Sequence, residues 1–442
     1  MMRWIGMILT CLHLSTATAQ ENSPYSRYGL GDIVPSQNIV NRSMGGIAAG
    51  YSDLQSVNFV NPASYGNLSY TLPGYQRNSI FEIGIEVDSR TLKSTNPAAK
   101  FTANNFIISY IQLGMPVRLK KLNKKGLFMG VSFGLKPVSK INYKILSIGR
   151  KAGIDSFATN YEGTGGVNEA NMGAGFRFKG FNVGFNTGYR FGNKDYSTKL
   201  NLINDSVLYY QSNSANRTNF GGVFLNLGVQ YELFLKNKAF LRLGAYGNLS
   251  QQMKGTQTTT RETVSYDANG TAYRIDSVYQ KMQDGTVTYP ANFGVGFTYK
   301  DSSNHWTFGA DYEQSYWSKY RFFNQAENVQ NTWKVRIGAE YLPAGMNNIK
   351  KYFSAVKYRA GFYIGTDYVN VGNNLPEYGF SFGAGFPLKL RKSFYETQTS
   401  YLNTSIEIGS RGDKKSNLRE STLRVCVGLS LGDLWFNRSK YY

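Results

Sequence analysis

The stretch KVRIGAEY, from Lys334 to Tyr341, contains the pattern that decides the fold. Apolar and polar residues alternate along it, with Val335, Ile337, Ala339 and Tyr341 in one set and Lys334, Arg336, Gly338 and Glu340 in the other. A period of two places the two sets on opposite faces of a β-strand. A strand between lipid and a polar lumen needs one apolar face and one charged face.

The same alternation recurs along the chain. It sets Phe181, Val183 and Phe185 against Asn182 and Asn186, and it returns from Leu423 to Gly432. The segments are longer than the ~5–6 residues of an average soluble strand, which favours a membrane barrel over a sandwich. We predict an all-β, fourteen-stranded antiparallel transmembrane β-barrel with strands at Ser79–Thr91, Phe101–Arg118, Leu127–Tyr143, Asn168–Phe178, Phe181–Phe191, Asn219–Phe234, Ala239–Met253, Pro290–Lys300, Trp306–Tyr316, Thr332–Tyr341, Lys357–Thr366, Tyr378–Pro387, Thr399–Gly409 and Leu423–Phe436.

The connections between these segments differ in length. Lys179-Gly180 is tight, whereas Lys144–Val167, Gly192–Thr218 and Lys254–Tyr289 are long enough for loops, with Val207–Gln211 strand-like inside one of them. In outer-membrane barrels the short turns face the periplasm and the long loops face outward. The sequence therefore predicts a bacterial outer-membrane protein with both termini in the periplasm.

The first residues suit a secretory signal. Arg3 is basic, Trp4–Leu14 is apolar, and Ala17-Thr18-Ala19 suits cleavage, so we expect residues 1–19 to be removed. Cys11 would also suit a lipoprotein signal, but the bulky Thr10 before it disfavours that cleavage. The mature chain then keeps one cysteine, Cys426, and one histidine, His305. That leaves no internal disulfide and little room for a catalytic or metal site, so we expect no enzyme, cofactor or metal.

The net charge is strongly basic, +21 over the whole chain. Nucleic acid is one class of partner for such a charge, but an exported protein seldom meets it and no compact basic run with aromatic residues is present. Anionic outer-membrane lipids and lipopolysaccharide are the better partners. Solvated basic loops would account for the charge equally well.

Three stretches resemble the FadL/TodX family of outer-membrane transporters for long-chain fatty acids and other hydrophobic compounds. They are Arg42–Gly46 with Asn61-Pro62-Ala63, then Pro290–Phe297 with Trp306–Ser318, and then Arg336–Tyr341 with Tyr358–Tyr363. The opening Ser23–Asp32 is similar to a Bacteroidota version of that barrel. The resemblance implies a leader and hatch at residues 20–78, a barrel at 79–436 and a short tail at 437–442.

The hatch implied by the resemblance agrees with the residues before the first strand. Gln20–Arg77 is too short for a good core of its own. Gly45 and Gly46 allow a close backbone approach, and Pro62 stiffens the chain between Asn61 and Ala63. We expect this segment to plug the lumen. A disordered leader is the alternative, but its many apolar residues, such as Ile39, Val40, Met44, Ile47, Val57, Phe59 and Val60, disfavour disorder.

Two further sites are expected in the wall. Pro137 cannot donate to a ladder, so with Gly134 it predicts a bulge or kink in the third strand, which the family resemblance makes a lateral gate toward lipid. A proline at the rim where the strand ends is the alternative. The last strand carries an assembly signal of alternating apolar and aromatic residues, namely Leu429, Leu431, Trp435 and Phe436.

The leading functional hypothesis is passive uptake of hydrophobic compounds such as long-chain fatty acids, which pass the hatch and leave laterally into the membrane. The alternative is an accessory barrel subunit of an outer-membrane secretion or assembly complex, with other complex subunits as partners. The sequence does not separate the two, because both would need the same barrel. A stoichiometric partner found by co-purification would favour the second hypothesis.

Overall fold

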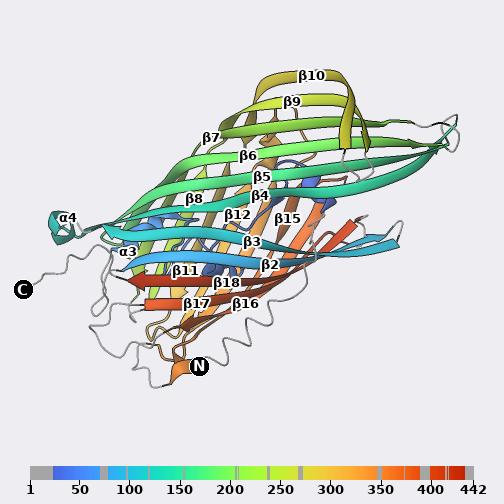
Figure 1. Cartoon of the computed structure of the whole chain (residues 1–442). Helices are drawn as coiled ribbons and strands as arrows, with labels where there is room; N and C mark the ends of the chain where they lie inside the picture. Colours follow the sequence, from blue (N-terminus) through green and yellow to red (C-terminus); the bar gives the residue numbers. More distant parts are fainter. Residues whose placement is uncertain are drawn as a thin grey trace, which may run out of the picture.

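The computed structural model describes residues 23–433 except 70–77, 96–97, 118–119, 153–154, 205–206, 208, 236–238, 267–271, 346–350, 373, 389–398, 414–415 and 417. Long antiparallel strands dominate it and close into a barrel, with short helical turns inside and at the ends (Figure 1). Among the described residues no helix is both long and apolar enough to cross a membrane.

The predicted fourteen-stranded barrel is confirmed. Its wall is made of β2 (Ser79–Thr95), β3 (Ala98–Val117), β4 (Leu127–Lys151), β5 (Asp155–Phe178), β6 (Phe181–Ile203), β7 (Gln211–Phe234), β8 (Phe240–Asn248), β11 (Asn292–Lys300), β12 (Trp306–Ser315), β14 (Thr332–Tyr341), β15 (Lys357–Asn370), β16 (Asn374–Pro387), β17 (Thr399–Arg411) and β18 (Leu418–Asp433). Pairing between β18 and β2 closes the barrel. β9 (Gln251–Tyr266) and β10 (Ala272–Tyr289) continue β8 and β11 outward as a hairpin.

The remaining elements are short. The segment before β2 contains η1 (Pro24–Arg27), β1 (Asp32–Ile33), α2 (Ile39–Arg42), η2 (Pro62–Ser64) and α3 (Tyr65–Leu68). The connections between wall strands contain α4 (Lys120–Lys124), η3 (Trp317–Lys319), β13 (Arg321–Phe322) and η4 (Tyr352–Ser354).

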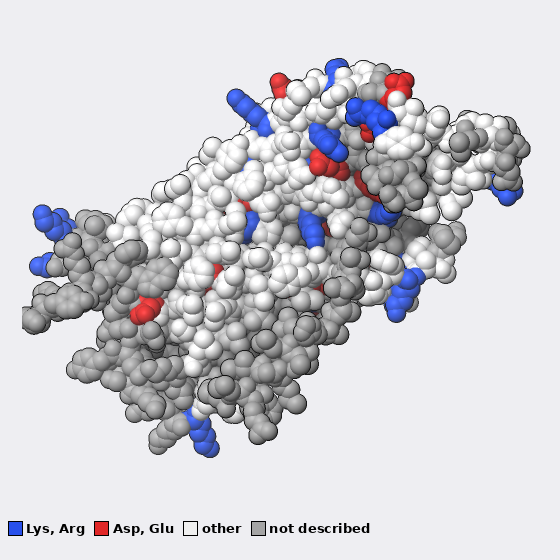
Figure 2. All heavy atoms as spheres, viewed as in Figure 1, with Lys and Arg blue, Asp and Glu red and all other residues white. Residues whose placement is uncertain are grey.

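The two faces of the wall strands follow the sequence alternation. On β14, Ile337 is 55% exposed whereas Arg336 is buried at 8%. On β18, Leu423 and Val425 are exposed, and Cys426 is fully buried as a free cysteine. The visible wall is accordingly mostly uncharged (Figure 2). The apolar face of each strand therefore points toward lipid and the charged face toward the lumen.

The sequence predicted the strand boundaries correctly at one end of the barrel. At the other end several strands are longer than predicted. The short-turn end, with Lys179-Gly180 between β5 and β6, agrees with the prediction. The stretches predicted as long loops are wrong: most of Lys144–Val167, Gly192–Thr218 and Lys254–Tyr289 is strand. The ladders continue beyond the membrane, where a strand no longer needs an apolar outer face and the alternation in the sequence weakens. We call this the long-hairpin end.

Two details of the strands also differ from the prediction. Val207 and Tyr210 lie outside the strands, so the strand expected at Val207–Gln211 is wrong apart from its last residue, which begins β7. The strand expected from Ala239 to Met253 breaks after Asn248, and its partner breaks at Pro290. Proline has no N–H for the ladder, which accounts for the second break.

The expected periplasmic N-terminus falls on residues 1–22, which lie outside the described residues, and the first described residue is Ser23. Ser23 lies at the long-hairpin end, because its N–H donates to Asn142 O (3.3 Å) and its hydroxyl to Glu420 (2.5 Å). Asp433, the last described residue, pairs with Ser79 at the short-turn end. The described chain therefore begins and ends at opposite ends of the barrel.

Candidate functional site

The plug, as we call residues 23–69, lies inside the barrel. Its residues contact lumen-facing groups all around the wall: Arg42 contacts β2 and β17, the Gly45 N–H donates to Ser381 Oγ on β16 (2.8 Å), and Ser69 donates to β4. A segment that reaches strands on all sides of a closed barrel occupies its lumen (Figure 1). The expected hatch covers these residues, and its role as a hatch stays a prediction.

Gly45 and Gly46 lie where the plug comes closest to the wall. Both have positive φ, +70° and +86°. A Cβ on Gly45 would meet the backbone of Ile337 at 2.7 Å and of Phe362 at 2.8 Å. Only glycine satisfies the left-handed conformation and the close approach together, which gives the predicted glycine pair its physical reason.

The Asn-Pro-Ala turn caps the other half of the plug. Asn61 Oδ1 accepts a hydrogen bond from Ala63 N (3.1 Å), and Asn61 Nδ2 donates to Ala49 O (2.7 Å) and to carbonyls on β7 and β8. Pro62 begins η2, where its missing N–H costs nothing. Asn61 and Ala63 are fully buried. The turn thus satisfies backbone groups that a buried loop would otherwise leave unpaired.

The sequence prediction missed three charged plug residues that form ion pairs with the wall. Arg42 binds Glu86 and Glu407, and a sequence signal existed, because a lone arginine in an apolar, glycine-rich stretch needs a buried partner. Asp32 binds Arg90 and Arg411, whereas Asp53 binds Lys357 (2.8 Å). The partners of all three lie on β2, β15 and β17.

The electrostatics of Asp53 follow from its ion pair. Burial alone would raise the pKa of the Asp53 carboxyl, but the Lys357 ammonium and its hydrogen bond outweigh burial and lower that pKa to about 2. The arginines beside Asp32 likewise hold its pKa below the ordinary value against the opposing effect of burial. Both plug carboxylates are therefore charged at neutral pH.

An apolar cluster closes the lumen at the long-hairpin end. It brings the N-terminal part of the plug together with the connection between β12 and β14 and with side chains around the wall. The Trp317 and Tyr368 rings are 4.5 Å apart, and Tyr368 donates to Tyr28 O (2.8 Å). We call this cluster the cap; its buried residues are Tyr25, Leu30, Val138, Val167, Phe220, Met253, Val287, Trp317, Tyr320, Tyr368, Val369 and Leu375.

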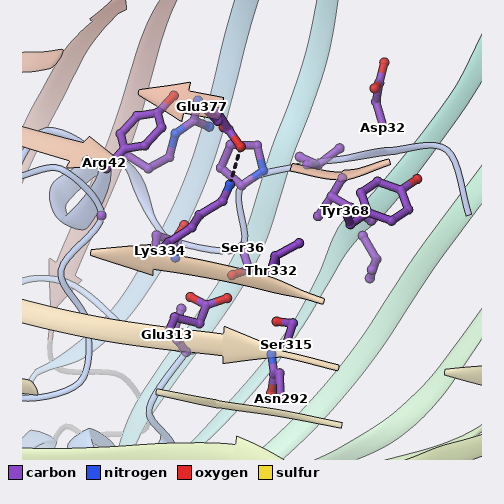
Figure 3. Close-up of a pocket in the computed structure, with 18 of the residues that line it drawn as sticks. Asp32, Ser36, Arg42, Asn292, Glu313, Ser315, Thr332, Lys334, Tyr368 and Glu377 are labelled. Carbon is purple, nitrogen blue, oxygen red and sulfur yellow. Dashed lines mark ion pairs between the residues drawn. The ribbon is translucent and has the colours of Figure 1, made fainter. Parts of the chain in front are cut away.

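A cavity of about 250 Å³ lies between plug and cap. Phe59 and Val60 of the plug line it on one side and Trp317 of the cap on the other. Most of the rest of its lining is polar or charged, and charged side chains there form ion pairs, for example Lys334 with Glu377 at 2.8 Å (Figure 3). The charged residues that line it are Asp32, Arg42, Arg90, Lys136, Glu169, Arg190, Glu313, Lys334, Arg336, Asp367, Glu377, Glu407, Arg411, Glu420 and Arg424.

Gly134 and Pro137, the expected lateral-gate residues, lie on β4 where it leaves β3. The ladder between β3 and β4 runs from Val117↔Met129 to Ile111↔Leu135 and stops there. The pairing of β4 with β5 shifts register directly after Pro137. From this point toward the long-hairpin end, β3 and β4 diverge (Figure 1). We call the divergent part the seam; a gating role for it stays a prediction.

The plug covers the β4 side of the seam. β1 pairs with Ser139 and Lys140 of β4, Val34 N donates to Val138 O (3.0 Å), and the Ser139 hydroxyl donates to Leu30 O (2.6 Å). These bonds satisfy backbone groups of β4 that β3 does not reach. No pattern in the sequence predicts this contact.

The expected assembly signal is partly described. Leu429 and Leu431 lie on β18, whereas Trp435 and Phe436 lie outside the described residues, as do residues 1–22 and the tail 437–442. Among the described residues no group of three or more His, Cys, Asp or Glu side chains could hold a metal ion.

A closed barrel with an apolar outer belt, a charged inner face and a plugged lumen defines an integral protein of the bacterial outer membrane. The chain belongs to the BamG family, whose model matches residues 1–442. No curated protein matches the chain.

Solved structures with the same fold are FadL-type barrels, which confirms the predicted resemblance at the level of fold. The toluene transporter TodX of Pseudomonas putida is 15% identical, with a TM-score of 0.53 over 93% of this chain and 100% of that one. The CymD monoaromatic hydrocarbon channel is 14% identical (0.51; 93% and 99%), and a FadL homologue of Pseudomonas aeruginosa is 11% identical (0.52; 91% and 99%).

Proposed function

We propose that this protein is an accessory barrel of an outer-membrane secretion or assembly complex, with the other subunits of that complex as its partners. The observation that carries the proposal is the lumen, which the plug fills at one end and the cap at the other. The cavity between them, at about 250 Å³, is smaller than the ~300–1,000 Å³ of ordinary ligand pockets.

The lining of the cavity does not suit a hydrophobic ligand. Transfer of an apolar molecule from water is favourable only into apolar surroundings. Here the molecule would displace water from charged groups such as Glu313 and Lys334 without replacing their hydrogen bonds, which is unfavourable. The paired charges instead link the plug to the wall, and the outer surface is left for contacts with partner subunits.

Purification in a mild detergent tests this proposal. The tagged barrel should bring down a stoichiometric outer-membrane partner, and the purified barrel should show no conductance in planar bilayers. A barrel that purifies alone, and whose removal from cells slows uptake of a hydrophobic probe, would contradict it.

Uptake of hydrophobic compounds, including long-chain fatty acids, is the second candidate, and the seam favours it. The ladder between β3 and β4 ends at Leu135, next to Gly134 and Pro137, so the wall has a break through which a ligand past the hatch could leave laterally. In this hypothesis the plug must move from the lumen. Tying Arg42–Ala63 to the wall with an engineered disulfide should then abolish uptake, and unchanged uptake would contradict it.

We further propose the orientation that the turn lengths favour, with the short-turn end and the C-terminus in the periplasm and the long-hairpin end outside; a periplasmic N-terminus also stays a prediction. Surrounding lipids and lipopolysaccharide would then contact the apolar belt. Cysteines placed at Ser212 or Asp276, both exposed at the long-hairpin end, should be labelled on intact cells. Labelling of both positions only after lysis would reverse the orientation. The signal peptide at residues 1–19, the short tail at residues 437–442 and the absence of catalysis also stay predictions.

A further inference from the structure

We propose that the edge of β3 in the seam is a docking site for one extended strand of a partner outer-membrane protein, which pairs with β3 and continues the wall. This inference rests on the proposed accessory function and names the surface and the kind of segment that the partner supplies. Four observations support it.

The first observation is the unfinished sheet. From Ala98 to Tyr110, β3 pairs with β2 on one side, and among the described residues no second strand lies on its other side. A sheet edge displays rows of N–H and C=O groups, and in lipid each unsatisfied group costs several kcal/mol. Another strand is the partner that matches such a row, since lipid tails provide neither donors nor acceptors.

The second observation is that the plug completes only the β4 side. β1 and its neighbours bond to Val138, Ser139 and Asn142 of β4. Apart from the Ile39 N–H, which donates to the Tyr110 hydroxyl of β3 (3.2 Å), the backbone bonds that the plug makes in the seam go to β4 in the described chain. The N-terminal segment therefore stabilises one lip of the seam and leaves the β3 lip for another strand.

The third observation comes from a second long edge, that of β10. From Ala272 to Thr286, β10 pairs with β9 alone. This edge has the features that protect natural edges from pairing. Its ladder with β9 shifts register twice, and the exposed edge includes Arg274, Asp276, Lys281 and Asp284. The β3 edge has one charged residue, Lys100, and no proline. The chain thus protects one edge and leaves the other able to pair.

The fourth observation is the apolar surface beside the seam. Phe106 is 63% exposed and Ile108 is 49% exposed on the outer face of β3, in the same range as lipid-facing residues with strands on both sides, such as Ile337 at 55%. A strand added to β3 would place its outward side chains beside Phe106 and Ile108. The partner segment should therefore alternate, with apolar residues outward at these positions.

A photocrosslinking amino acid at Phe106 or at Ile108, in cells that carry the whole complex, tests the proposal. The adducts should fall on one short segment of one protein, and the adducted residue should shift by two when the probe moves from 106 to 108. That shift is the signature of strand pairing. The same probe at Phe308, on β12 with strands on both sides, should give no discrete protein adduct.

Edge charges provide the matched variants. Thr102→Lys together with Asn104→Lys places two lysines on the β3 edge and should reduce the adduct from Phe106 at least about tenfold. Gln280→Lys with Met282→Lys, on the β10 edge, should leave it unchanged. Heat-modified gel mobility shows whether each barrel has folded.

Adducts with lipid or lipopolysaccharide alone, adducts without register, or adducts unaffected by the β3 lysines would overturn the inference. If a stoichiometric partner still co-purifies in that case, the accessory function stands and the docking site fails. If no partner co-purifies, the accessory function itself fails.

Discussion

The hairpin of β2 and β3 has two outer edges, and the wall treats them differently. β2 pairs with β18 along its whole length, from Ser79↔Asp433 to Ser94↔Leu418, although these strands lie at opposite ends of the sequence. β3 pairs with β4, its neighbour in sequence, only from Ile111 to Val117. The gap between β3 and β4 therefore does not lie at the joint between the first and the last wall strand, which is fully paired. It coincides with the register shift after Pro137 and with the pairing of the plug with the β4 edge.

The plug is also held differently on these two sides. The ion pairs of Asp32, Arg42 and Asp53 go to β2, β15 and β17, around the closed joint between β18 and β2. On β4 the plug is held mainly by hydrogen bonds to the backbone. The wall near the joint between β18 and β2 therefore holds the plug by ion pairs. We expect that separating the plug from β4 at the seam needs less energy than separating it from that joint.

The largest expected effect is the loss of the ion pairs beside the closed joint. Arg42→Met leaves Glu86 and Glu407 without their plug partner, and removal of one member of a buried ion pair costs about 3–5 kcal/mol. The free energy of unfolding in urea, measured in lipid vesicles, should fall by this amount. Arg274→Met breaks the exposed pair with Glu262 and should cost less than about 1 kcal/mol. Equal losses would show that the plug is not anchored there.

A glycine substitution tests the close approach of plug and wall on the same side. Gly45→Ala combines a left-handed backbone with a contact of 2.7 Å to Ile337 O, so we expect a loss of about 3 kcal/mol. Gly126→Ala has a similar φ of +78° and nothing within 4 Å of the added Cβ, so about 1 kcal/mol should be lost. Chemical unfolding measures both. A loss from Gly45→Ala no greater than that from Gly126→Ala would refute the close packing.

Acid should weaken the Asp53 contact in a defined range. The pKa of Asp53 is about 2 in the folded protein and about 4 when unfolded, so its contribution is complete above pH 4 and is lost as the pH falls toward 2. The difference in unfolding free energy between the wild type and Asp53→Asn should be roughly 2 kcal/mol at pH 6 and close to zero at pH 2. A difference that does not change with pH would show that the Lys357 pair contributes nothing.

The smallest effect is expected at the seam. Pro137→Val restores an N–H, but Val34 and β1 still hold the bend in β4, so stability should change by less than about 1 kcal/mol. Gly134 is unsuitable for the same test, because a Cβ there would collide with Gln112 and the backbone of Ile111. Hydrogen exchange of β3 reports the result. If the amides of β3 between Ala98 and Tyr110 became protected, Pro137 alone would keep the seam open.

The sequence determined the wall at the short-turn end and the residues of the plug turns. Alternation such as that of Lys334–Tyr341 fixes which face meets lipid, because one misplaced charge there is costly. The glycines at 45 and 46 and the Asn61 turn could be named because few residues adopt their conformations or satisfy a buried turn.

The tertiary structure alone decided how far the strands continue, what fills the lumen and where the seam ends. Outside the membrane a ladder is held by backbone bonds that any polar sequence can make, so the alternation no longer marks strand from loop. Ion pairs such as Arg42 with Glu407 join residues hundreds of positions apart, and the sequence offers many possible partners for each charge. The plug covers β4 rather than β3 because backbone hydrogen bonds carry no residue code, so only the fold decides which edge it meets.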